Sequence, residues 1–168
     1  SAGNGSNGTT TLAESSPEQV VYTPNADYNG TDTFSYTITQ GEKTSSADVT
    51  VTIEAVNDAP SINTASTIQA AENQTAVTTI SVSDVDEDDL TLSLSGTDVD
   101  SFDLSTDNVL TFKEAPDFET KSSYSITLSL TDGIETVTKD ITIVVTNVNG
   151  IAPVFTSEAT FSAAENQT

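Results

Sequence analysis

The sequence predicts an all-β protein made of tandem Greek-key β-sandwich modules, and three observations lead to this prediction. Apolar residues alternate with Ser and Thr in several runs, as in strands with one buried face. Turn-forming pairs such as Asn29-Gly30 and Asp132-Gly133 separate these runs at the short intervals typical of sandwiches. A segment that begins at Ala59-Pro60 recurs at Ala152-Pro153, 93 residues later. No stretch keeps a helical apolar stripe over three turns.

The expected strands can be assigned in chain order. In the first part of the chain, residues 34–38 and 49–53 alternate apolar residues with Ser and Thr, and Thr suits the solvent-exposed face of a strand. A further strand is expected near residues 66–70. Six more runs follow it, at 77–82, 90–94, 102–104, 109–112, 124–130 and 137–145. Together these strands are enough for one complete Greek-key sandwich.

The internal repeat sets the expected domain boundaries. Ala71-Glu72-Asn73-Gln74-Thr75 reappears as Ala164-Glu165-Asn166-Gln167-Thr168. We therefore expect residues 1–58 to be the C-terminal part of one repeat, 59–150 a complete repeat, and 151–168 the opening strand of a next repeat. A partial sandwich leaves a strand edge and half a core uncovered. One hypothesis is that residues 154–168 of another copy add to the incomplete first repeat.

The composition excludes several classes of function. The chain has 4 Lys, no Arg, no His and no Cys, against 26 Asp and Glu, for a formal net charge of −22. Nucleic acids and anionic membrane surfaces are poor partners for such a chain, because binding them requires clustered basic residues. His or Cys zinc sites, thiolate nucleophiles and Ser-His-Asp triads cannot be built. No apolar run is long enough for membrane insertion.

Oxygen ligands remain abundant, and they suit hard cations such as Ca²⁺. The densest acidic segment is Asp84-Val85-Asp86-Glu87-Asp88-Asp89, directly after an expected strand. Other candidates lie in turns or linkers: Asn57, Asp58, Glu72, Asp117, Glu119 and Asp132. A cation needs six to eight oxygens, more than one short segment usually provides. The alternatives are that the acidic segment is a solvated loop and that the turn carboxylates cap backbone N–H groups.

Several of these motifs, in this order and spacing, make the chain resemble the cadherin repeat in the form seen in large bacterial surface proteins. The motifs are Glu72-Asn73, Asp84-Val85-Asp86, Ala115-Pro116-Asp117-Phe118-Glu119, Thr131-Asp132-Gly133 and the linker Val56-Asn57-Asp58-Ala59-Pro60. The resemblance covers residues 59–153 and, less fully, 20–58. It implies a calcium-binding module whose ions lie at the junction between consecutive repeats.

The resemblance also implies two sets of ligands. The first junction would use Asp27, Asn29, Asn57, Asp58, Asp84, Asp86 and Asp132, and the second Glu72, Asp117, Glu119 and Asn149. Asn29 stands where the family prefers Glu, which lowers the negative charge at the first junction. Gly150 and Ile151 stand where Asp and Asn are expected, so the second junction should bind calcium more weakly.

By this resemblance, the chain is identified as part of the extender region of a large, secreted, RTX-type bacterial adhesin that serves cell adhesion or biofilm formation at the bacterial surface. Its partners would be the neighbouring repeats of the same chain. The alternative is a module that binds a polysaccharide or another cadherin-like repeat. Paired carboxylates can hydrolyse glycosides, but the chain has no Trp and no expected cleft, so we expect no enzyme.

Overall fold

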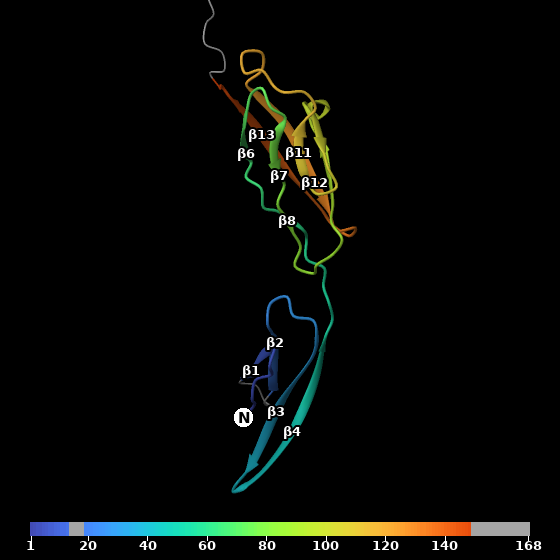
Figure 1. Cartoon of the computed structure of the whole chain (residues 1–168). Coiled ribbons are helices and arrows are strands. Elements are labelled where there is room, and N and C mark those ends of the chain that lie inside the picture. Colours follow the sequence, from blue (N-terminus) through green and yellow to red (C-terminus); the bar gives the residue numbers. More distant parts are fainter. Residues whose placement is uncertain (14–18, 149–168) are drawn as a thin grey trace, which may run out of the picture. The chain divides into compact units, whose positions relative to one another are not determined.

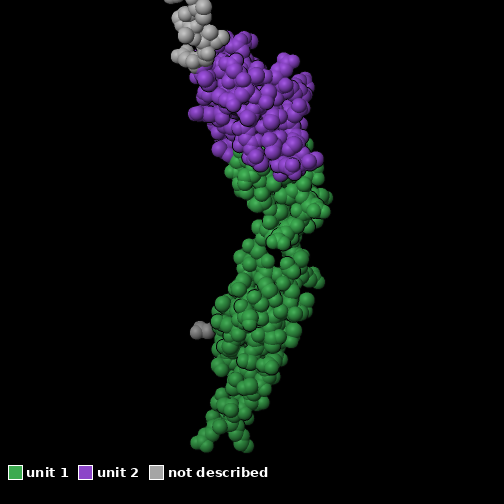
Figure 2. All heavy atoms as spheres, viewed as in Figure 1, with its two compact units in different colours: residues 1–64, 80–93, 128–139 green, residues 65–79, 94–127, 140–168 purple. Residues whose placement is uncertain are grey.

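The computed structural model describes residues 1–13 and 19–148, and its regular elements are strands apart from one short 3₁₀ turn (Figure 1). The prediction of an all-β fold is confirmed. Contacts divide the chain into two compact units (Figure 2). The first comprises residues 1–64, 80–93 and 128–139, and the second comprises 65–79, 94–127 and residues from 140 onward. Within the described residues, no helix is long and apolar enough to cross a membrane.

Two antiparallel hairpins make up the N-terminal part of the chain. β1 (Gly8–Ala13) pairs with β2 (Gln19–Pro24), and β3 (Gly30–Gln40) pairs with β4 (Lys43–Ile53). The Tyr22 ring stacks on Phe34, which is only 6% exposed, with ring centroids 5.7 Å apart. The sequence analysis predicted the cores of β3 and β4 but missed β1 and β2. These strands alternate weakly, because three consecutive threonines occupy half of β1 and apolar neighbours lie side by side in β2.

Asp32 on β3 holds this part of the chain together. Its buried carboxylate accepts hydrogen bonds from the backbone N–H groups of Ser6 (3.1 Å) and Asn7 (2.9 Å) and from the Tyr22 hydroxyl (2.6 Å). The Tyr22 hydrogen bond is the main reason that the pKa of Asp32 lies below its ordinary value. Only glycine fits at Gly5, where an added Cβ would lie 2.0 Å from the Asp32 carboxylate.

The remaining strands form two larger sheets and one small one. Their bounds are β5 (Ser61–Ile62), β6 (Thr67–Ala71), β7 (Ala76–Thr79), β8 (Val82–Ser83), β9 (Thr91–Ser95), β10 (Phe102–Leu104), β11 (Val109–Phe112), β12 (Ser123–Thr131) and β13 (Thr136–Thr146), with the 3₁₀ turn η1 (Val99–Ser101) before β10. The strand orders are β6-β13-β12-β9, β10-β11-β7 and β5-β8. β6 runs parallel to β13, whereas the hairpin pair β10 and β11 is antiparallel.

The inward faces of β12 and β13 supply most of the core. Ile126, Leu128 and Leu130 on β12, and Ile141, Ile143 and Val145 on β13, are at most 1% exposed. Phe102, Phe112 and Tyr124 add an aromatic cluster with centroid separations of 4.6 to 5.7 Å. Burial at every second residue is the consequence of the period-two pattern in the sequence.

The expected strand over residues 77–82 is two strands in the structure. β7 ends at Thr79 and pairs with β11, whereas β8 begins at Val82 and pairs with β5 in another sheet. The chain changes sheets at Ile80, which stays buried, and alternation alone cannot reveal such a change. The proposed boundaries of 1–58 and 59–150 stay predictions. The predicted opening strand in 151–168 lies outside the described residues.

The Asp32 hydrogen bonds predict an acid-sensitive N-terminal part. A carboxylate with a lowered pKa stabilises the folded state above its ordinary pKa, and this contribution is lost as the pH falls through the folded-state pKa. We expect Asp32→Asn to lower the unfolding temperature at pH 7 by several degrees, because an amide NH₂ then faces N–H donors. The variant should also flatten the loss of stability between pH 5 and pH 3.

Calorimetric unfolding over this pH range measures both effects. Asp48→Asn removes an exposed carboxylate from β4 and serves as the matched control. Equal behaviour of the two variants would contradict the assigned role of Asp32.

Candidate metal centres

The first acidic cluster lies in the loop that follows β8. Asp84, Asp86 and Asp88 each offer a carboxylate oxygen, and these oxygens lie within 4.8 Å of one another. The Asp84 Oδ1 atom accepts hydrogen bonds from the backbone N–H groups of Asp86 (2.8 Å) and Asp88 (3.5 Å). Glu87 has a φ of 61°, so the chain turns sharply between the last two aspartates. The loop is therefore folded around the carboxylate of its own first residue.

Asn57, Asp58 and the turn between β12 and β13 join this cluster. The Asp58 backbone N–H donates to Asp86 Oδ2 at 2.7 Å, and the Asn57 side-chain amide donates to Asp132 Oδ2 at 3.0 Å. Asp132 Oδ1 also accepts the backbone N–H groups of Ile134 (2.7 Å) and Glu135 (2.6 Å). The hydrogen bond from Asn57 lowers the pKa of Asp132 most, and the hydrogen bond from the Glu135 backbone N–H lowers it further. The pKa therefore lies below its usual range, although partial burial acts to raise it.

The charges of this cluster are not compensated within the described part of the chain. Asp84 Oδ2 is buried and has no hydrogen-bond partner there. Burial is the main cause of the raised pKa of Asp88, and the negative charges of Asp84 and Asp86 raise it further. The one ion pair among the described residues joins Lys121 to Asp98, and neither residue belongs to the cluster. Buried polar atoms without partners are rare and costly, so this arrangement suits a bound cation. Its all-oxygen donor set fits Ca²⁺.

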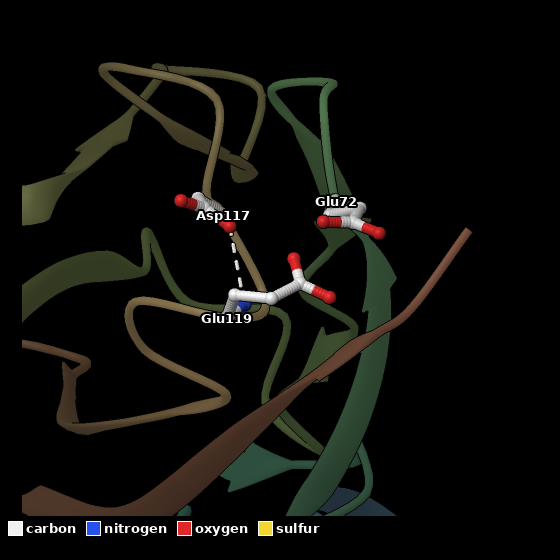
Figure 3. Close-up of side chains that lie close together, drawn as sticks. All are labelled: Glu72, Asp117 and Glu119. Carbon is white, nitrogen blue, oxygen red and sulfur yellow. Dashed lines mark hydrogen bonds between the residues drawn. The ribbon is translucent and has the colours of Figure 1, made fainter. Parts of the chain in front are cut away.

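A second cluster consists of Glu72, Asp117 and Glu119, whose carboxylate oxygens also lie within 4.8 Å of one another (Figure 3). Glu72 follows β6 and is only 6% exposed. Its two oxygens accept the backbone N–H groups of Phe118 (3.2 Å) and Val148 (2.7 Å). Each carboxylate oxygen still has a free lone pair, so these bonds leave Glu72 able to bind a cation.

The turn that carries Asp117 and Glu119 is fixed by its own hydrogen bonds. Asp117 accepts the Glu119 backbone N–H (3.1 Å) and the Thr120 hydroxyl (2.6 Å), and the Thr120 bond is the main cause of its lowered pKa. Glu119 Oε1 accepts the side-chain amide of Asn147 at 2.7 Å. The turn thus holds its two carboxylates beside Glu72, and the capping bonds expected as an alternative to metal binding are present at Asp117.

The structure brings together most of the residues that the sequence suggested. Asn57, Asp58, Asp84, Asp86 and Asp132 are linked around the first cluster, and Glu72, Asp117 and Glu119 form the second. Asp88 was not selected as a ligand, although the alternation of Asp84, Asp86 and Asp88 would have indicated it.

Asp27 is not joined to either cluster by any hydrogen bond among the described residues. It lies exposed in the turn between β2 and β3 with a φ of 59°. Asn29 is also exposed in this turn. Asn149, Gly150 and Ile151 fall outside the described residues.

A hollow of about 400 Å³ lies beside η1 and the turn before Asp117. Asp100, Lys113 and Tyr124 are among the residues that line it. Phe112, also in the lining, is only 3% exposed, and Lys121 lies over the Tyr124 ring, 4.5 Å from its centroid. The hollow therefore offers no open aromatic platform of the kind on which a sugar ring stacks.

Comparisons with known proteins agree with this fold. The family model of the bacterial Ig domain matches residues 1–53. Human protocadherin-24 EC1-2 is similar in structure, with 22% identity over 54% of this chain and 45% of that chain and a TM-score of 0.50. Protocadherin gamma B7 cadherin domains 1–4 give 15% identity over 89% of this chain and 41% of that chain, with a TM-score of 0.56.

Human mucin-like protocadherin EC1-2 gives 17% identity over 85% of this chain and 86% of that chain, with a TM-score of 0.53. The chain spans less than half the length of the first solved structures that it matches. No functionally curated protein matches the sequence. At these identities the matches establish a cadherin-like and Ig-like fold, and this part of the predicted resemblance is confirmed.

The raised pKa of Asp88 predicts a conflict between stability and metal binding. A carboxylate whose pKa is raised by folding destabilises the folded state when it is ionised, and the folded state gains stability as the pH falls through that pKa. Without metal, Asp88→Asn should therefore raise the unfolding temperature at pH 7. The same change should weaken calcium binding at least roughly tenfold, because calcium affinity depends on the number of charged ligands.

Thermal unfolding in a chelator and calorimetric titration with CaCl₂ measure the two effects. Asp107→Asn, in the exposed turn between β10 and β11, is the control and should change neither value. A lower unfolding temperature for metal-free Asp88→Asn would contradict the electrostatic account.

Proposed function

We propose that this chain is a calcium-rigidified extender segment of a large bacterial cell-surface adhesin, serving cell adhesion or biofilm formation outside the cell. One observation carries the proposal: linker residues Asn57 and Asp58 are hydrogen-bonded to the acidic cluster of Asp84, Asp86, Asp88 and Asp132. A cation bound by that cluster would therefore act directly on the linker between consecutive modules.

The mechanism is electrostatic. Without an ion, the carboxylates repel one another and two hydrogen bonds hold the linker to the cluster. Ca²⁺ would convert the repelling groups into shared ligands, with Asp84, Asp86, Asp88 and Asp132 supplying carboxylate oxygens and Asn57 and Asp58 supplying linker oxygens. The buried, unpartnered Oδ2 of Asp84 supports this assignment. Asp27 remains the proposed ligand from the preceding repeat.

The second cluster would serve the following junction in the same way. Glu72, Asp117 and Glu119 are its ligands among the described residues, and Asn147 is tied to it through Glu119. Its three carboxylates carry less charge than the four of the first cluster, so we expect weaker binding there. Neighbouring repeats of the same chain are the proposed partners at both junctions.

The bacterial Ig match over residues 1–53 and the cadherin-like fold both support a role as a non-enzymatic module in a tandem array. The alternative is a module that binds a polysaccharide or another cadherin-like repeat. Without an open aromatic platform, polysaccharide binding would have to use hydrogen bonds from polar residues of the hollow, such as Asp100 and Lys113. Two results together would favour the alternative. The chain would bind on a glycan array and lose this binding in the Lys113→Ala variant, and calcium would leave the stability of the chain unchanged.

Calcium should raise the unfolding temperature of this chain. An ion that binds the folded state at about 100 times its Kd stabilises that state by about 2.7 kcal/mol, a shift on the order of 10 °C for a domain of this size. Mg²⁺ should have a much smaller effect, because it binds poorly where many protein oxygens must replace its waters. The measurement is calorimetric unfolding in chelator, CaCl₂ and MgCl₂.

The double variant Asp84→Asn with Asp86→Asn should remove most of the calcium shift. The control, Asp103→Asn with Asp107→Asn, removes the same charge from exposed positions in the second unit, whereas Asp84 and Asp86 belong to the first. An unchanged unfolding temperature with calcium, or an equal loss in both double variants, would refute the proposed mechanism.

A further inference from the structure

Glu87, in the loop that carries the first acidic cluster, has an unusual backbone conformation for its residue type. Four residues other than glycine have a positive φ in the described part of the chain, and the other three are Asp27, Asn73 and Asn108. Asn and Asp tolerate the left-handed region, because their short side chains can bond to the nearby backbone. Glu lacks this advantage, so its φ of 61° carries a steric cost. Such a conformation persists only where the surrounding structure holds it.

The Glu87 side chain does not account for this conformation. It is exposed, and it makes no hydrogen bond or ion pair with any other described residue. Its two neighbours in the chain, Asp86 and Asp88, both belong to the first cluster. The backbone at position 87 therefore matters for what it does to these neighbours.

The left-handed residue turns Asp88 back towards the start of its own loop. Along an extended strand, the Cα atoms of Asp84 and Asp88 would lie about 13 Å apart. In the structure, Asp84, Asp86 and Asp88 offer carboxylate oxygens within 4.8 Å of one another. The Asp88 backbone nitrogen also lies 3.5 Å from Asp84 Oδ1. Glu87 is the only residue of the loop with a positive φ, so its conformation decides whether the third carboxylate joins the cluster.

Two energies oppose this arrangement when no ion is bound. One is the steric cost at Glu87, and the other is the repulsion among three carboxylates at short range. The buried Oδ2 atom of Asp84 has no hydrogen-bond partner among the described residues to offset that repulsion. A loop in which residue 87 leaves the left-handed region would avoid both costs, but it would release Asp88. A cation bound by the three carboxylates would favour the left-handed loop.

We propose that Glu87 is a positioning residue that sets the calcium affinity of the first cluster, because its backbone determines how many metal-free molecules have Asp88 in place. This inference rests on the proposed function and adds the regulation of that site. When only a fraction of molecules is competent to bind, the apparent Kd rises in inverse proportion to that fraction. Glu87 thus keeps the affinity below the value that the ligands alone would give, although it supplies no ligand itself.

Three substitutions at position 87 separate the backbone effect from the charge. Glu87→Gln, Glu87→Gly and Glu87→Val remove the same negative charge, but they differ in how easily the residue adopts a positive φ. Gly adopts it freely, whereas a β-branched residue such as Val resists it most. Calorimetric titration with CaCl₂ should therefore give the lowest Kd for Glu87→Gly and the highest for Glu87→Val. We expect Glu87→Gly to bind at least about threefold more tightly than Glu87→Gln.

Removal of the third carboxylate tests whether residue 87 acts through Asp88. The Glu87→Gly and Glu87→Gln substitutions are each combined with Asp88→Ala. Both double variants should bind calcium more weakly than the single variants, and their Kd values should be equal, because no third carboxylate remains to be positioned. A merely structural role of Glu87 would not produce this dependence on Asp88.

Asn108 provides the control for a change at a left-handed position outside the cluster. It lies in the turn between β10 and β11 with a φ of 60°. Asn108→Gly and Asn108→Val should differ in unfolding temperature for the same steric reason as the variants at position 87. Their calcium Kd values should equal that of the unaltered chain.

The outcomes distinguish this inference from the proposed function. Equal calcium Kd values for Glu87→Gly and Glu87→Gln would overturn the inference and leave the proposed function in place. A difference that persists in the Asp88→Ala background, or an equal change of Kd in the Asn108 variants, would overturn it in the same way. A chain that does not bind calcium at all would refute the proposed function, and the inference with it.

Discussion

The structure depends most on one electrostatic constraint, the concentration of carboxylates from Asp84, Asp86, Asp88 and Asp132 at the end of the linker. Backbone N–H groups and the Asn57 amide hold these side chains in place, but they neutralise little of the charge. The buried Oδ2 of Asp84 has no donor among the described residues. The fold therefore supplies an all-oxygen donor arrangement that suits a cation, and hydrogen bonds to Asp86 and Asp132 tie Asn57 and Asp58 of the linker to it.

Much of the fold could be predicted because β-structure follows a local pattern. Alternation of apolar and hydroxyl residues located β12 and β13, and the repeated motifs indicated which turns would carry carboxylates. The errors arose where long-range pairing decides the outcome. The sequence of residues 77–82 does not indicate that β7 and β8 pair with different strands. In β1, too few residues are apolar for a period-two pattern to be recognised. At the candidate site, backbone donors decide which side chains converge. The alternation of Asp84, Asp86 and Asp88 indicates the third carboxylate, but it does not reveal the turn at Glu87 that precedes it.

Burial is even less local than pairing. Ile38 and Leu128 occupy equivalent places in similar hairpins, and only Leu128 is buried. The pattern makes both segments strands with one apolar face, but a second layer must come from elsewhere to bury that face.

Overall charge and local charge then have separate roles. At physiological ionic strength, exposed charges more than about 8 Å apart are largely screened, so most of the net charge of −22 contributes to solubility and little to the geometry of the linker. The carboxylates of Asp84, Asp86 and Asp88 have oxygens within 4.8 Å of one another, inside that screening distance, and they are partly removed from water. Their mutual repulsion therefore persists in salt. A multivalent cation can relieve it by direct coordination, whereas a monovalent salt atmosphere cannot, so the proposed response of the linker to calcium would differ from a response to ionic strength.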